Sequence, residues 1–321
     1  MAPKVIVTRP LPEPGIALLT DAGFDVWVNP VDRPIDRGTL LSMVGDADAL
    51  LCMLTDRVDA ELLDAAPGLK VIVNFAVGYD NIAVAEARGR GIEVATTPGV
   101  LTDASADLAW ALLMAASRRI GEGERLMRSG EWTGWSPTQL LGRPLRGQVL
   151  GIVGMGAIGQ AVARRASGFE MEIVYHNRNR VAPETEAALG ARYVSIDELL
   201  TISDFVSLHT PLNEESRHLF GAPAFDMMKP TAVLVNTGRG PVIDEAALVI
   251  ALRDRQIFAA GLDVYEFEPA VVDGLVELDN VVLAPHLGSA STVARADMVR
   301  LCSNNIIEVL AGRPAITPAP R

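Results

Sequence analysis

Short runs of β-branched and aliphatic residues alternate with longer segments of helical spacing along the whole chain of 321 residues. Such alternation is typical of parallel strands joined by helices, and it predicts the α/β class. A first series of strands is expected at 5–8, 24–28, 49–53, 71–75 and 93–96, and a second at 149–153, 172–175, 205–209, 232–236, 259–263 and 281–284. The two series predict a five-stranded unit followed by a larger one.

The boundary between the two units is expected at residues 95–99, Ala-Thr-Thr-Pro-Gly. The residue before Pro98 is pushed away from helical backbone angles, and Gly99 permits an unusual one. A helix is predicted next, at 102–117; it is apolar nearly all round and is expected to be buried between layers or subunits. The last predicted helix, at about 292–310, has no strand after it and is expected to return to the first unit. We therefore predict one domain at 1–98, completed by 290–321, and a second at 99–289.

The charge balance restricts the possible partners. Lys and Arg total 28 and Asp and Glu total 40, so the net charge is 28 − 40 = −12. This balance argues against the basic surface that binds nucleic acids or anionic membranes. No apolar stretch is long enough to predict a membrane span. The two cysteines, Cys52 and Cys302, are too few for a disulfide framework, and a cytoplasmic protein is expected.

A glycine-rich loop follows the first predicted strand of the second unit. Gly154, Gly156 and Gly159 form the pattern G-x-G-x-x-G, and Ala157 and Ile158 begin the alanine-rich helix that comes next. The first glycine allows a tight turn, the second lets a pyrophosphate approach the backbone, and the third permits close packing of helix on strand. The alternative is a structural turn. Strand, loop and helix in this order favour dinucleotide binding.

The end of the next strand bears on the choice of coenzyme. An Asp or Glu about 20 residues beyond the loop would bind the ribose 2′-hydroxyl of NAD, whereas an Arg would accept the 2′-phosphate of NADP. The chain has Asn177, Arg178, Asn179 and Arg180 there, and no acid. This pattern favours NADPH. The alternative is that the arginines are solvated surface charges.

Polar residues also follow three other strands of the second unit, at the edge where open α/β sheets bind ligands. Arg239 lies between two glycines, and its guanidinium can bind a carboxylate through two hydrogen bonds. Glu266 and Glu268 follow the next strand, and His286 follows the last one. A carboxylate beside His286 would stabilise and orient its protonated ring. The combination indicates an acid catalyst.

The other histidines carry less information. His209, which precedes Thr210 and Pro211, is expected to line the coenzyme cleft, whereas His176 and His218 are expected to be peripheral. The histidines and cysteines have none of the spacings typical of metal ligands, so no metal is expected. A serine or cysteine hydrolase is disfavoured because the chain lacks a G-x-S-x-G motif.

Taken together, these motifs resemble those of the D-isomer-specific 2-hydroxyacid dehydrogenase family over essentially the whole chain. The segments that carry the resemblance are 154–159, 236–240, 261–269 and 285–290. Within the family, the segments 74–81, 132–137 and 175–178 are most similar to those of glyoxylate/hydroxypyruvate reductases. The resemblance implies two Rossmann-like domains around a cleft, a flavodoxin-like substrate-binding domain and a dinucleotide-binding domain, and a homodimer.

The resemblance also implies roles for individual residues. Arg239 would bind the substrate carboxylate and carbonyl, His286 would be the acid/base, and Glu268 would be its partner. Val77 and Gly78 would offer backbone amides to the substrate, and Trp135 would reach the partner subunit's site; simple interface packing is the alternative for the tryptophan. The implied coenzyme contacts are Ser105, Gly154, Gly156, Ala157, Ile158, Gly159, Asn177, Arg178, Asn179, His209, Thr210, Pro211, Thr237, Gly238, Arg239, Asp263, His286 and Gly288.

The leading hypothesis is an NADPH-preferring reductase that converts glyoxylate or hydroxypyruvate to the D-2-hydroxy acid. Val77 stands where related phosphite dehydrogenases carry a Lys, and residues 74–81 include no basic residue. A small monocarboxylic keto acid therefore fits best. The alternatives are a reductase of another 2-keto acid, such as 2-ketogluconate, and a nicotinamide-sensing binding protein with weak turnover.

Overall fold

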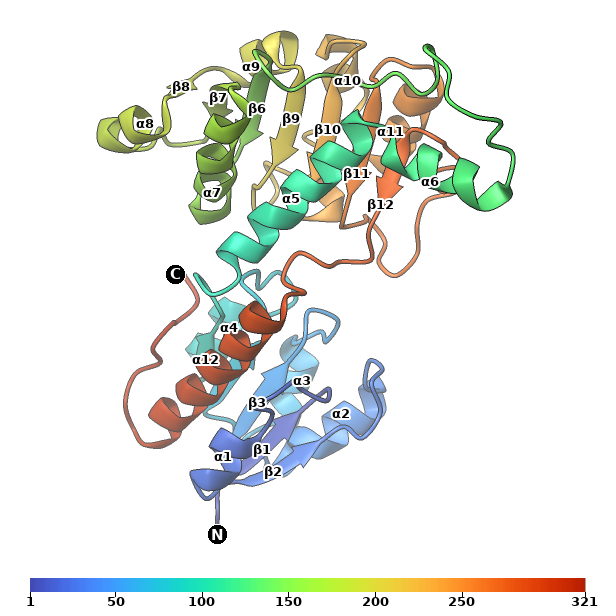
Figure 1. Cartoon of the computed structure of the whole chain (residues 1–321). Coiled ribbons are helices and arrows are strands. Elements are labelled where there is room, and N and C mark those ends of the chain that lie inside the picture. The colour runs from blue at the N-terminus through green and yellow to red at the C-terminus, as the bar shows by residue number, and fades with distance from the viewer. Residues whose placement is uncertain (321) are drawn as a thin grey trace. The chain divides into compact units, whose positions relative to one another are not determined.

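The computed structural model describes residues 1–320, and the chain divides into two compact units. The first unit comprises Met1–Leu101 and Ser289–Arg321, and the second comprises Thr102–Gly288 (Figure 1). The divisions fall at 101/102 and 288/289, whereas the sequence predicted them at 98/99 and 289/290. Each unit is built on a parallel sheet with helices, so the predicted α/β class is confirmed.

The first unit has a five-stranded sheet in the order β2-β1-β3-β4-β5. The strands are β1 (Lys4–Val7), β2 (Asp25–Val28), β3 (Ala49–Cys52), β4 (Val71–Asn74) and β5 (Glu93–Ala95). Its helices are α1 (Ala17–Asp21), α2 (Arg37–Met43), α3 (Ala60–Ala65), α4 (Val84–Gly89) and the C-terminal α12 (Thr292–Leu310). Helix α12 packs on β3, β4, β5 and α1 (Figure 1), so the last helix does return to the first unit.

The second unit has a seven-stranded sheet in the order β12-β11-β10-β9-β6-β7-β8. The strands are β6 (Val149–Val153), β7 (Glu172–His176), β8 (Ala191–Tyr193), β9 (Phe205–Leu208), β10 (Val233–Asn236), β11 (Ala259–Leu262) and β12 (Val281–Leu283). All pairings between neighbouring strands are parallel. Each predicted strand of both units is present, with its ends within one residue of those expected. Strand β8 was not predicted, because three residues are too few to form a recognisable pattern.

Helices cover both faces of this second sheet. They are α5 (Thr102–Ser117), α6 (Ile120–Ser129), α7 (Ala157–Ala166), α8 (Pro183–Leu189), α9 (Ile196–Ile202), α10 (Ala222–Met227) and α11 (Glu245–Arg253). Helix α5 runs across the sheet and packs on β10, β11 and α7 (Figure 1). Its approach is close, because a Cβ on Gly261 of β11 would lie 2.9 Å from the Cβ of Leu112. One face of the apolar helix predicted at 102–117 is thus buried within its own unit, whereas Asp103, Asp107 and Ala111 are exposed.

Separate hydrophobic cores hold the layers together. In the second unit, one core includes Leu113 and Val162 from α5 and α7, and the other includes Leu199, Phe225 and Leu248 from α9, α10 and α11. A third core stabilises the first unit. Burial of this apolar surface is the main favourable contribution to folding. Over residues 1–320, no helix combines the length and apolar character that a membrane crossing needs.

Candidate functional site

The register of the second sheet brings the polar residues at its strand ends together. Asn236, Leu262 and Leu283 lie side by side at the carboxyl ends of β10, β11 and β12. The loops that follow these strands carry Arg239, Glu268 and His286. On the other side of β10, the ends of β9, β6 and β7 form a second group. One edge of the sheet therefore holds two adjacent sets of polar residues.

His286 and Glu268 form a hydrogen-bonded pair. Nδ1 of His286 lies 2.9 Å from Oε2 of Glu268, and the other oxygen of Glu268 accepts a hydrogen bond of 3.0 Å from the N–H of Tyr265. Burial would raise the pKa of the Glu268 carboxyl, but the hydrogen bond and charge of His286, the N–H of Tyr265 and the charge of Arg239 outweigh it and lower the pKa. The carboxylate can therefore stabilise a protonated imidazole. Within residues 1–320, Nε2 of His286 makes no hydrogen bond and can face a substrate.

Arg239 is presented by a tightly built loop after β10. The Asn236 side chain accepts a hydrogen bond from the N–H of Gly238 and donates one to the carbonyl of Arg239, each 3.0 Å long. A Cβ on Gly240 would lie only 1.9 Å from the carbonyl carbon and oxygen of Tyr265, so glycine is required there. The loops that carry Arg239 and Glu268 therefore pack directly against each other.

Two of the residues predicted to contact the coenzyme, Asp263 and Ser105, hold the His286 loop. Asp263 is fully buried, and its carboxylate accepts hydrogen bonds from the N–H groups of Leu287 and Gly288, at 2.6 and 2.8 Å. The hydroxyl of Ser105, on α5, donates to the carbonyl of Gly288 at 3.1 Å. Burial raises the pKa of Asp263, while these N–H groups and His286 oppose that rise. The sequence placed Asp263 at a strand end, but only the fold indicates what its carboxylate binds.

A pocket of about 500 Å³ lies at the ends of β6, β7 and β9. Among the residues predicted to contact a coenzyme, those that line it are Gly154, Gly156, Asn177, Arg178, Asn179, His209, Thr210 and Pro211. Asn213, Glu215 and Ser216 also line it and were missed, because they lie on a loop without a recognisable motif. His176 lines it as well, so the expectation that this histidine is peripheral was wrong, because the last residue of β7 lies at the same sheet edge as the pocket. Burial lowers the pKa of His209 to about 4, so its ring is neutral at pH 7.

The glycine-rich loop has the shape that a pyrophosphate needs. A Cβ on Gly154 would lie 2.6 Å from the carbonyl of His209, and one on Gly159 would lie 2.1 Å from the carbonyl oxygen of Gly154. At Gly156, by contrast, an added Cβ would meet nothing within 4 Å. The hydroxyl of Thr237 is buried and has no hydrogen-bond partner in the described part of the chain. An open glycine at the start of α7, where Ala157 and Ile158 form the first turn, and an unused hydroxyl both fit a bound dinucleotide.

The two arginines after β7 have different surroundings. Arg178 is 74% exposed, lines the pocket and lies 3.5 Å from a carboxylate oxygen of Glu215. Arg180 binds both oxygens of Glu186, at 2.7 and 2.6 Å, and Glu186 also accepts a hydrogen bond from Tyr175. Arg180 is therefore paired with a residue of α8 and, unlike Arg178, does not line the pocket, although the sequence suggested the same role for both arginines.

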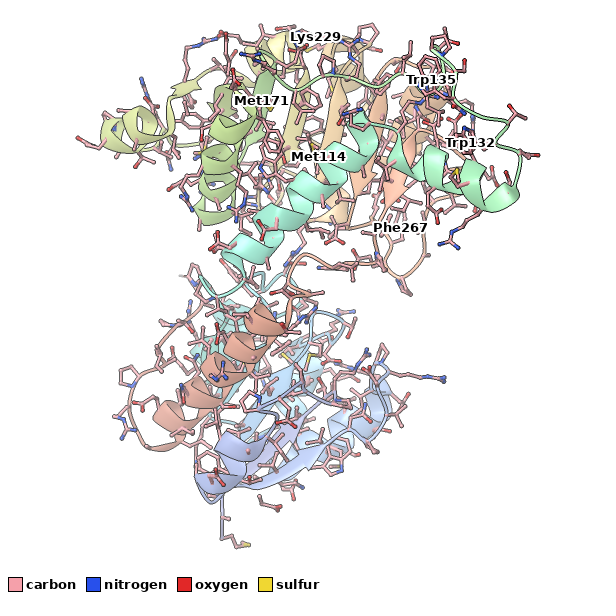
Figure 2. All side chains as sticks on the ribbon, in the orientation of Figure 1. Met114, Trp132, Trp135, Met171, Lys229 and Phe267 are labelled. Atoms are coloured by element: carbon pink, nitrogen blue, oxygen red, sulfur yellow. The ribbon has the colours of Figure 1, made fainter. Side chains whose placement is uncertain are left out.

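The remaining predicted substrate contacts lie outside these loops. In the first unit, the carbonyl of Gly78 accepts a hydrogen bond of 2.7 Å from Asn74, and the N–H groups of Val77 and Gly78 have no acceptor within residues 1–320. Trp135 is 81% exposed on the segment after α6 (Figure 2). Among the described residues, no group of three or more His, Cys, Asp or Glu side chains could hold a metal ion.

Comparison with known proteins shows which family the chain resembles. The family model of the NAD binding domain of D-isomer specific 2-hydroxyacid dehydrogenases matches residues 110–288, which span most of the second unit. A glyoxylate reductase from Thermococcus litoralis is 51% identical over 317 residues, which cover 97% of this chain and 95% of the relative.

Solved structures agree over nearly the whole chain. The TT0316 protein from Thermus thermophilus has 44% identity and a TM-score of 0.93, covering 99% of this chain and 100% of its own. An NADPH-dependent glyoxylate/hydroxypyruvate reductase from Sinorhizobium meliloti, solved with NADP and malonate, has 32% identity and a TM-score of 0.86, covering 99% and 97%. The chain therefore belongs to the D-isomer specific 2-hydroxyacid dehydrogenase family and is an NAD(P)-dependent oxidoreductase.

Proposed function

We propose that the protein reduces glyoxylate, hydroxypyruvate and similar small 2-keto acids to D-2-hydroxy acids, with NADPH preferred over NADH. The observation that carries this proposal is the His286–Glu268 pair, 2.9 Å apart, at the same sheet edge as Arg239. The names of the relatives support it, since one is a glyoxylate reductase and another an NADPH-dependent glyoxylate/hydroxypyruvate reductase.

The chemistry assigns one task to each of the three side chains. Arg239 binds the substrate carboxylate and draws electron density towards the keto oxygen. His286 enters protonated and donates its Nε2 proton to that oxygen, while Glu268 stabilises the imidazolium and keeps the ring oriented. When bound, the coenzyme supplies the hydride that the carbonyl carbon receives. In the reverse direction, neutral His286 accepts the hydroxyl proton.

The two units would divide the work of binding. We propose that the second unit binds the coenzyme and that the first binds the substrate carboxylate through the N–H groups of Val77 and Gly78. Both N–H groups lack an acceptor within residues 1–320, and an anion would satisfy them. Because residues 74–81 contain no cation, a substrate with a single carboxylate is favoured.

The preference for NADPH rests on the loop after β7. No acid follows this strand to bind a ribose 2′-hydroxyl, and the exposed guanidinium of Arg178 lines the pocket. A 2′-phosphate carries more charge than the carboxylate of Glu215, so it can displace that partner from Arg178. Asn177 is held in place because its side chain accepts a hydrogen bond of 2.6 Å from the N–H of Met155.

We also propose that the protein is a cytoplasmic homodimer. Large apolar side chains are exposed on α6 and the segment after it, namely Ile120, Met127, Trp132, Trp135 and Leu141. Ile120, Met127 and Trp132 line one hollow, and an exposed apolar patch commonly marks a protein interface. Figure 2 labels the two tryptophans. Sedimentation of the wild type and of the Trp135→Ser variant would test the assembly.

The proposed cytoplasmic location rests on the cysteines. Both are free thiols, as in proteins of a reducing compartment.

The test of the proposed reaction is a set of initial rates with NADPH and NADH against glyoxylate, hydroxypyruvate, pyruvate and 2-ketogluconate. We expect the highest kcat/KM with glyoxylate or hydroxypyruvate and NADPH. A preference for NADH would overturn the coenzyme assignment alone, and activity confined to 2-ketogluconate would overturn the substrate assignment. An absence of turnover with every pair would overturn the reductase and favour a nicotinamide-sensing protein.

A further inference from the structure

We infer that Glu245 is a positioning residue of the catalytic site, because its carboxyl group fastens the loop that carries Glu268. This inference rests on the proposed reaction, in which Glu268 must stay aligned with His286. The role requires an acceptor oxygen at this position, and the negative charge of the carboxylate is not needed.

Glu245 contacts that loop two residues before Glu268. Its side chain is 1% exposed at the first residue of α11 and turns into the core. Oε1 accepts a hydrogen bond of 2.9 Å from the N–H of Glu266. The segment itself contains only an isolated bridge between Phe267 and Ala270, so it depends on such contacts for its shape.

The same loop is fixed from a second side by Gly240. A Cβ added to Gly240 would lie 1.9 Å from the carbonyl of Tyr265, so the two backbones are in contact. The Glu268 loop therefore cannot move closer to the loop of Arg239. Glu245 follows Gly240 by one short 3₁₀ turn (Gly240–Val242) and the N-cap Asp244. The segment that carries Arg239 thus also carries Glu245, whose carboxyl group holds the Glu268 loop.

The surroundings of Glu245 explain why its charge is dispensable. Oε2 is buried and has no hydrogen-bond partner within the described residues, so no cation balances an ionised carboxylate there. Glu266 lies beside it and is paired with His218 at 2.5 Å, while Glu268 is paired with His286. Burial and the charges of Glu266 and Glu268 raise the pKa of Glu245, against the opposing effect of the N–H groups of Glu266 and Val272. An ionised Glu245 would add a third negative charge beside Glu266 and Glu268, and the repulsion among the three carboxylates would destabilise the loop.

Three variants separate positioning from general stability. Glu245→Ala removes the acceptor, whereas Glu245→Gln keeps an acceptor oxygen and removes the charge. Asn280→Ala is the matched control, because Asn280 is also buried and its amide donates to the carbonyls of Leu252, in the last turn of α11, and of Phe258, each at 3.1 Å. Asn280 makes none of these contacts with the Glu268 loop.

We expect Glu245→Ala to lower kcat about tenfold to a hundredfold, as misplacing a catalytic group does. The alkaline limb of the kcat profile for keto-acid reduction should move to lower pH, because a misaligned Glu268 no longer favours protonated His286. The other charged groups around Glu268, Arg239 and Asp263, are unchanged. The Kd of NADPH should stay within about twofold, and Glu245→Gln should restore both kcat and the pH profile.

The Asn280→Ala control should lower Tm and leave the pH profile unchanged. The inference is overturned if Glu245→Ala keeps the wild-type profile, if Glu245→Gln is as impaired as Glu245→Ala, or if Asn280→Ala shifts the profile equally. If Glu245→Ala does not fold, Glu245→Asp replaces it, because its shorter side chain withdraws the acceptor while staying polar.

An NMR spectrum of the His286 ring, assigned with His286→Asn, gives a readout that needs no turnover. Changed chemical shifts of the ring in Glu245→Ala are expected, and unchanged shifts would contradict the inference. Failure of the proposed reaction would instead appear as inactive wild-type enzyme, so the two failures are distinguishable.

Discussion

Asp263 holds His286 in place through its backbone and its side chain. The carbonyl of Asp263 accepts the N–H of His286 at 2.9 Å, and its carboxylate accepts the N–H groups of the next two residues. His286 has a φ of +55°, in the left-handed region that residues other than glycine rarely adopt. The three hydrogen bonds therefore stabilise an unfavourable backbone angle at the proposed acid/base.

Replacing Asp263 with Asn should misplace His286. The amide nitrogen is a donor and cannot accept the second N–H, so one backbone group is left unsatisfied, at a cost of about 1–3 kcal/mol. We expect a lower Tm and a lower kcat, measured by thermal unfolding and steady-state kinetics. Asp244→Asn is the control, because Asn also caps a helix well. An Asp263→Asn enzyme with wild-type kcat would show that catalysis does not need both hydrogen bonds of the Asp263 carboxylate.

His286→Asn should lower kcat for keto-acid reduction by about 10²–10⁴-fold, the usual contribution of a general acid. The coenzyme should still bind, as measured by nucleotide fluorescence. His218 offers the matched control, since its Nε2 lies 2.5 Å from Glu266 in a similar His–Glu pair. His218→Asn should retain most of the activity. Comparable losses in both variants would argue against a special role for His286.

Arg178→Ala should weaken NADPH binding by about tenfold to a hundredfold, because a hydrogen bond to a charged group contributes about 1.5–3 kcal/mol. NADH lacks the 2′-phosphate, so its Kd, measured by calorimetry, should change by less than about twofold. Arg180→Ala is the control: Arg180 is held by Glu186, and its loss should lower Tm without changing the ratio of the two Kd values. Equal weakening of both coenzymes by Arg178→Ala would refute the role of this arginine.

Gly156→Ala should fold normally and bind coenzyme poorly. The added methyl group meets no protein atom within 4 Å, but it would occupy the space through which a pyrophosphate approaches the loop. We expect an unchanged Tm and a Kd raised at least about tenfold for both coenzymes. Gly168→Ala, where the space is equally open, should change neither quantity. Unchanged coenzyme binding in Gly156→Ala would contradict the proposed binding mode.

Acid should selectively weaken the loop that follows β7. Hydrogen bonds from Arg180 and Tyr175 lower the pKa of Glu186 to about 2, from an ordinary value of 4.5. A lowered folded-state pKa stabilises the protein above the ordinary value, and this contribution is lost as the pH falls from about 4.5 towards 2. The Tm difference between wild type and Glu186→Gln should therefore be largest near pH 6–7 and should shrink below about pH 4.5. A difference that is independent of pH would rule out this ionic contribution.

Much of the architecture could be predicted from local patterns. The apolar runs predicted the strands of both sheets except β8, and helical spacing predicted α5 and α12 with the observed bounds. The spacing of Gly154, Gly156 and Gly159 predicted a phosphate loop whose packing has the expected shape. The motifs also identified the family correctly. These features are readable because each depends on residues close together in the chain.

By itself, then, the sequence determined the fold class, the strands and the residue types at their ends. Only the tertiary structure decided which partner each polar group has: Glu186 takes Arg180 away from the pocket, Asp263 binds the backbone after His286, and Glu245 binds the loop around Glu268. The physical reason is that hydrophobic periodicity is local, whereas these hydrogen bonds are set by parallel strand register and by burial. A polar residue at a strand end indicates a possible site, but the register of the neighbouring strands decides its partner.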